Sequence, residues 1–120
     1  MISFWLHGQP PRKSNSRQIV RNGDHVRVIK SDKALQWVES ALAQIPPEAR
    51  QGIGSAKHPI RATFNVYYET RRPDLSVELV LDTLQKAGVI SDDRHVYELH
   101  AFKWFCKDRP GVYCELEVMG

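Results

Sequence analysis

Acidic residues concentrate in the segment 71–96, where they have a spacing that could do chemistry. Asp74 lies near its start, Glu78 follows four residues later, and the pair Asp92-Asp93 lies near its end. Crowded carboxylates repel one another and raise one another's pKa unless a cation is present. Mg²⁺ suits such a group because it prefers hard oxygen ligands and keeps several waters, and Mn²⁺ is a possible substitute. A bound Mg²⁺ can activate water and hold a phosphodiester, so the segment predicts metal-assisted hydrolysis.

The elements that must position these carboxylates are a helix and a turn. The apolar spacing predicts a helix from about Asp74 to Lys86, with Gly88 just past its end. At 100° per residue, Asp74, Glu78 and Asp82 share one narrow sector of this helix, beside its apolar stripe. If the turn that carries Asp92-Asp93 folds back to the start of the helix, Asp74 would meet this pair.

Each of these carboxylates also has a structural interpretation. Asp74 follows a proline and could cap a helix, because acidic side chains favour helix N-termini. Glu78 and Asp82 could form a solvated helix face, and Asp92-Asp93 could be turn residues. His95, beside the pair, is interpreted as a half-exposed residue at a strand edge.

Basic residues that could contact a DNA backbone lie close to these acids and near the N-terminus. The segment 10–33 carries seven lysines and arginines against two aspartates, within a chain of net charge +3 and pI about 9.0. Such a surface attracts polyanions because phosphate binding releases counterions, although ordinary solubility explains a mild excess equally well. The candidate DNA-contacting residues are Arg12, Lys13, Asn15 and Arg17 before and within a predicted hairpin, Arg71 and Arg72 before the acidic segment, and Lys103.

The pattern along the chain predicts an α+β fold, in which a small mixed β-sheet is packed by two helices. Asn22-Gly23 between two β-prone runs is typical of a hairpin, and Ser31 is a plausible N-cap for a helix that Pro46-Pro47 ends. The stretch 46–58 is predicted to be a long loop. The predicted strands are residues 2–7, 18–21, 24–29, 60–68, 96–106 and 111–118.

Composition narrows the class of protein. A chain of 120 residues with 42% hydrophobic residues suits one domain, residues 1–120, with one modest core that dimerisation would help to stabilise. We expect a cytoplasmic protein, because no apolar run approaches membrane-spanning length and the start does not resemble a signal peptide. Cys106 and Cys114 lack metal-binding spacing and are interpreted as strand or core thiols. Trp5, Trp37 and Trp104 are interpreted as core or dimer-interface residues.

The segment 71–96 resembles the core of the RusA family of Holliday junction resolvases, which are endodeoxyribonucleases of phages and prophages. The family has an Asp-x-Asp-Asn motif at the start of a helix, a lysine one turn later, an Ala-Gly helix end and an Asp-Asp pair. Here Pro73-Asp74-Leu75 resembles the start, Ala87-Gly88 the helix end and Asp92-Asp93 the pair. The opening residues 8–15 resemble the family's first loop, and the chain length agrees.

The resemblance implies a homodimer that binds four-way DNA junctions and cleaves them with Mg²⁺ in recombination and repair. Asp74 and Asp93 would be metal ligands, and Asp92 would support them. Two departures matter: the second motif aspartate is absent, since Ser76-Val77 follows Leu75, and so is the catalytic lysine.

These departures, together with the mild positive charge, leave three functions open. In the first, Glu78 replaces the missing carboxylate as a catalytic metal ligand, and Arg71, Arg72 or Lys103 supplies the positive charge. In the second, the protein binds branched DNA but is catalytically impaired. In the third, the domain binds another protein and has no nucleic-acid role.

Overall fold

The computed structural model describes residues 1–11 and 17–120, with some side chains of the hairpin 17–30 left out. The order of elements agrees with the sequence prediction. The strands are β1 (Ile2–His7), β2 (Arg17–Asn22), β3 (His25–Lys30), β4 (Ile60–Tyr68), β5 (Val96–Phe105) and β6 (Gly111–Val118). The helices are α1 (Asp32–Gln44) and α2 (Glu78–Lys86), with short 3₁₀ turns η2 (Pro47–Ala49) and η3 (Asp93–His95).

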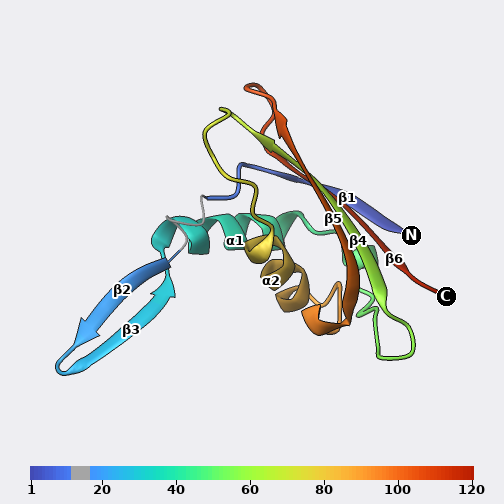
Figure 1. Cartoon of the computed structure of the whole chain (residues 1–120), viewed down its shortest axis with the longest axis horizontal. Coiled ribbons are helices and arrows are strands. Elements are labelled where there is room, and N and C mark those ends of the chain that lie inside the picture. Colours follow the sequence, from blue (N-terminus) through green and yellow to red (C-terminus); the bar gives the residue numbers. More distant parts are fainter. Residues whose placement is uncertain (12–16) are drawn as a thin grey trace.

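A mixed four-stranded sheet in the order β1-β6-β4-β5 carries the fold. β6 is antiparallel to both β1 and β4, whereas β5 is parallel to β4. Both helices lie on one side of this sheet, and β2 and β3 form a separate hairpin that projects beyond one end of α1 (Figure 1). The predicted α+β fold with a small mixed sheet and two packing helices is confirmed.

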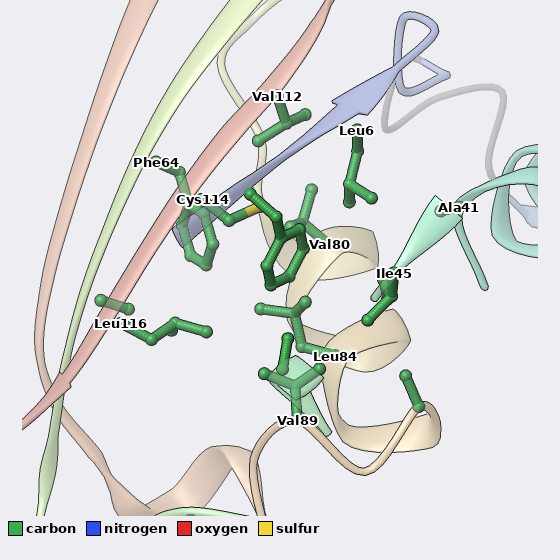
Figure 2. Packing of buried hydrophobic residues seen from close by; sticks show 14 of the residues in the cluster. Leu6, Ala41, Ile45, Phe64, Val80, Leu84, Val89, Val112, Cys114 and Leu116 are labelled. Atoms are coloured by element: carbon green, nitrogen blue, oxygen red, sulfur yellow. The ribbon is translucent and has the colours of Figure 1, made fainter. Parts of the chain in front are cut away.

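The core lies between the sheet and the helices. β4 alternates strictly, so that Phe64 and Val66 are fully buried while Asn65 between them is partly exposed. Val80 and Leu84, one turn apart on α2, point into the same layer and meet the inward side chains of β6 (Figure 2). The alternation along the strands and the helical spacing along α2 therefore place their apolar side chains in one continuous buried layer.

Local signals define α1 as expected. The Ser31 side chain accepts a hydrogen bond from the backbone N–H of Ala34 at 3.2 Å, and the helix ends directly before Pro46-Pro47. Trp37 is buried, and its indole N–H donates to the carbonyl of Gly8 at 3.1 Å. No helix in the described part of the chain is long and apolar enough to span a membrane.

Two loop predictions need correction. Asn22 pairs with His25, so the two-residue loop of the hairpin is Gly23-Asp24 instead of Asn22-Gly23. Gly23 has φ of 63° and Asp24 does not have a positive φ, so only the first loop position requires glycine. The stretch 46–58 is not structureless, because Ile53 forms a parallel bridge with Ile90 and its N–H donates to the carbonyl of Val89 at 3.1 Å.

Both cysteines are free thiols on the sheet or at its end, as predicted. Cys114 is buried in the core, and this burial raises the pKa of its thiol. Cys106 lies just past β5, which ends at Phe105, one residue earlier than expected. Trp104 is not a core residue, since 48% of its surface is exposed, and its alternative interpretation as a dimer-interface residue stays a prediction.

An ion-pair network crosses three strands on the sheet face away from the helices. Arg61 of β4 donates to Glu98 of β5 and to Glu117 of β6, each at 2.7 Å. His100 lies 2.8 Å from the other carboxylate oxygen of Glu98. The hydrogen bond with His100, followed by that from Arg61, lowers the pKa of Glu98.

This network predicts a pH-dependent effect of Glu98→Gln. A carboxyl whose pKa is lower in the folded state stabilises the fold above its ordinary pKa of 4.5, and loses this contribution as the pH falls through the lowered value. We therefore expect Glu98→Gln to lower the Tm at neutral pH and to match wild type in strong acid, in thermal unfolding followed by circular dichroism. Glu39→Gln, at an exposed position of α1, is the control and should follow wild type at every pH. A Tm difference for Glu98→Gln that persists unchanged into strong acid would contradict the assignment.

Candidate functional site

The candidate residues belong to a parallel β4–α2–β5 unit. β4 and β5 run side by side in the same direction, from Ile60 beside Val96 to Tyr68 beside Phe105, and α2 connects them. In such a unit the chain leaves the first strand at one end of the sheet and enters the second at the opposite end. Asp74 lies in the first of these connections, whereas Asp92 and Asp93 lie in the second.

The connection that carries Asp74 is tethered to the end of β4 by Tyr68. The Tyr68 hydroxyl donates to the carbonyl of Asp74 at 3.3 Å and accepts from the backbone N–H of Ser76 at 3.4 Å. Desolvation by burial is the main cause that raises the pKa of Tyr68, so the hydroxyl keeps its proton and can donate. The Asp74 side chain itself is exposed.

The predicted start of the second helix was wrong. α2 begins at Glu78, four residues after Asp74, and Val77 occupies the capping position without a side-chain hydrogen bond. Asp74 therefore neither caps this helix nor shares a helical face with Glu78 and Asp82. Glu78 is the first residue of α2, and both its side chain and that of Asp82 are exposed. The end of α2 agrees with prediction, since Gly88 follows the last turn with φ of 78°.

The pair Asp92-Asp93 forms a turn bound to the other end of α2. The Asp92 carboxylate accepts from the backbone N–H of Arg94 at 3.0 Å, and this hydrogen bond is the main cause that lowers the pKa of Asp92. The backbone N–H of Asp93 donates to the side-chain amide oxygen of Gln85 at 3.0 Å. Asp92 thus caps η3, and His95, the last residue of η3, is partly exposed.

The structure does not bring the three predicted metal ligands together. Asp93 contacts Gln85, and from Gln85 back to Glu78 the helix rises about 10 Å at about 1.5 Å per residue. Asp74 precedes Glu78 by four residues and lies before the start of α2. Across the described residues, which include all three ligands, no group of three histidine, cysteine or acidic side chains could hold a metal ion. The arrangement within one chain therefore does not fit the expected Mg²⁺ or Mn²⁺.

Basic side chains gather at the end of the sheet where Asp74 lies. The Lys103 ammonium donates to the carbonyl of Arg71 at 2.8 Å, and the Arg71 guanidinium lies over the Phe105 ring at 5.3 Å from its centre. Arg72 follows and is exposed. These contacts hold Arg71 against β5 while all three cations remain accessible, which suits contact with phosphate.

Two further cations at this end were missed by the sequence analysis. Lys107 and Arg109 lie in the connection from β5 to β6, which crosses the end of β4. This connection is tied there by the N–H of Cys106, which donates to the carbonyl of Tyr68 at 2.8 Å. In the sequence a turn with two cations is typical of a solvated loop, and only the strand order places it beside Arg71. We call Arg71, Arg72, Lys103, Lys107 and Arg109 the basic end.

Acidic side chains lie in the same connections as the basic end. Glu69, Asp74 and Asp108 belong to the same connections, so five cations face three anions there. The opening loop joins this end as well, because the Gln9 side chain accepts from the N–H of Glu69 at 2.7 Å. The candidate contacts Arg12, Lys13 and Asn15, which follow this loop, lie outside the described residues. Arg17 is placed only as the first residue of β2.

Comparison with known proteins adds no identification to these observations. Neither the protein-family models nor the curated proteins match this chain. The resemblance to the RusA family therefore stays a prediction from the motif residues of the segment 71–96.

Proposed function

We propose that this chain binds branched DNA, above all four-way junctions, through the basic end. The observation that carries the proposal is the gathering of Arg71 and Arg72 from one connection and Lys103 from β5, with Arg71 held in place by β5. Cations fixed on a rigid scaffold can follow a phosphate backbone without ordering long side chains on binding. The similarity of the segment 71–96 to the RusA core supports branched DNA as the partner.

Of the two DNA functions expected from the sequence, the geometry favours binding over cleavage. The carboxylates of Asp74 and Asp93 lie at opposite ends of α2, and neither a second motif aspartate nor a catalytic lysine is present. Glu78 cannot replace the missing motif aspartate beside Asp93, because the length of α2 also separates these two residues. We therefore infer a catalytically impaired junction-binding protein, whose homodimeric state remains a prediction from the resemblance.

A binding and cleavage assay on one synthetic four-way junction tests this proposal. We expect salt-sensitive binding in EDTA, tighter than to a linear duplex of equal length, and intact junction strands after incubation with Mg²⁺ or Mn²⁺. Asp74→Asn should bind the junction as well as wild type or better, because it removes a negative charge beside the basic end.

Each alternative has its own outcome in this assay. Metal-dependent nicking that Asp74→Asn abolishes would show that the chain is an endonuclease after all. Absence of any binding to the junction at low salt would favour the protein-interaction domain.

A further inference from the structure

The face of the four-stranded sheet away from α1 and α2 carries a row of aromatic side chains. Strand residues that alternate with the buried ones point to this face. They include Trp5 of β1, Tyr113 of β6, Tyr67 of β4, and Phe102 and Trp104 of β5. No described helix lies on this side of the sheet (Figure 1). We call this surface the aromatic face.

The strand register arranges the aromatic face in two neighbouring rows across all four strands. Trp5, Tyr113, Asn65 and Phe102 occupy one row, and the next row contains Tyr67 and Trp104. Tyr67 and Trp104 are nearly parallel, at 21° with 6.3 Å between ring centres, and Trp5 lies 5.3 Å from Tyr67. The rings therefore form one continuous surface from β1 to β5.

Glycine and hydrogen bonds hold these rings in place. Gly111 belongs to the second row, where it pairs with Tyr67, and a Cβ atom there would come within 2.9 Å of the Trp5 ring and 2.4 Å of the Leu6 carbonyl oxygen. The indole N–H of Trp104 donates to the side-chain oxygen of Asn65 at 2.8 Å. Trp104 nevertheless exposes 48% of its surface and Phe102 exposes 47%. Large rings that are fixed and exposed bind with little loss of conformational entropy.

Charge is distributed unevenly along this face. The aromatic rows lie at the end of the sheet where the basic end begins, since Trp104 of β5 shortly precedes the connection that carries Lys107 and Arg109, whereas Lys103 pairs with the inward-facing Val66 and points to the other face. The opposite end of the same face carries Glu98 and Glu117, bridged by Arg61. An apolar partner would not require cations at one end of the sheet and carboxylates at the other. A polymer with flat aromatic groups and an anionic backbone fits both the exposed rings and the cations beside them.

We propose that the aromatic face stacks the unpaired bases of single-stranded DNA while Lys107 and Arg109 of the basic end hold its phosphates. Aromatic side chains bind every base, because each has a π-face, and adjacent cations supply affinity that depends on salt. The choice of DNA rests on the proposed junction-binding function. The aromatic face lies apart from the segment 71–96. It extends the proposed binding from junctions to DNA whose bases are unpaired.

Titration of wild type and Trp104→Ala with an oligothymidine of roughly 10 nucleotides tests the inference. We expect the oligonucleotide to quench tryptophan fluorescence in wild type, since stacking places a base on an indole ring. Trp104→Ala should weaken binding about 5- to 100-fold in fluorescence anisotropy, the range expected for the loss of one stacked base. Phe102→Ala is a second variant with the same expected direction.

Leu99→Ala is the matched control for these variants. Leu99 lies on the same strand, is 46% exposed, and pairs with the inward-facing Ala62, so it points to the other face of the sheet. It should bind the oligonucleotide as wild type does. Thermal unfolding of each variant checks that the fold is retained.

Measuring the fully paired junction on the same proteins separates this inference from the proposed function. Junction binding by wild type, combined with oligonucleotide binding that is absent or unaffected by Trp104→Ala and Phe102→Ala, would overturn the stacking surface alone. Oligonucleotide binding that depends on Trp104, without junction binding, would overturn the proposed function and leave the stacking surface standing. Conversion of a dimer into a monomer by Trp104→Ala in sedimentation, with oligonucleotide binding unchanged, would make this face a contact between copies and also overturn the inference.

Discussion

Replacement of Arg71, Arg72 and Lys103 together by alanine is expected to weaken binding to a four-way junction at least about 100-fold, because a hydrogen bond to a charged group contributes roughly 1.5–3 kcal/mol. The three cations share one end of the sheet, and Arg71 is held there by Lys103 and Phe105. The slope of log affinity against log salt concentration should also fall by about 2–3 units, close to 0.9 for each lost phosphate contact. Fluorescence anisotropy at several salt concentrations measures both quantities.

A second triple variant controls for the loss of net charge. Lys57, Lys86 and Arg94 are exposed at the opposite end of the β4–α2–β5 unit: Lys57 precedes β4, Lys86 is the last residue of α2 and Arg94 lies between α2 and β5. Their joint replacement by alanine removes the same charge and should leave most of the junction affinity intact. Equal losses from both triple variants would mean that DNA responds to overall charge, and the basic end would not be the binding site.

The largest effect on stability is expected for Phe64→Ala. Phe64 is fully buried in the middle of β4, between Ala101 of β5 and Cys114 of β6, and its ring faces the α2 side of the sheet (Figure 2). Truncation of a buried phenylalanine removes its transfer free energy and leaves a cavity, which together cost about 3–5 kcal/mol. Because small domains unfold with only about 5–15 kcal/mol, urea unfolding should show a large shift of the midpoint.

Phe102→Ala is the matched comparison for this variant. The same side chain is removed from the neighbouring strand, at a position that is 47% exposed on the uncovered face of the sheet. We expect a change of less than about 1 kcal/mol in the free energy of unfolding. Similar losses for both variants would contradict the view that one face of the sheet forms the core and the other is free.

The local structure of most elements could be predicted from the sequence, because the interactions that determine it lie within a few residues. Alternation identified β1 and β4, and Ser31 and Gly88 marked a helix start and a helix end correctly. The start of α2 could not be predicted in this way. Asp74 resembles a cap in the sequence, but Tyr68 holds its carbonyl in the connection before the helix, and Tyr68 is brought there by the sheet.

The candidate site depended on information that local patterns do not contain. The sequence by itself determined that acidic and basic residues of these types lie near the ends of α2 and its flanking strands. Only the tertiary structure decided which of them meet, because the parallel pairing of β4 with β5 places Asp74 and Asp93 at opposite ends of one unit. The crossing of the β5–β6 connection over β4 likewise brought Lys107 and Arg109 to Arg71. The direction of strand pairing and the order of strands in a sheet are set by contacts between distant residues, so alternation and spacing along the chain leave them open.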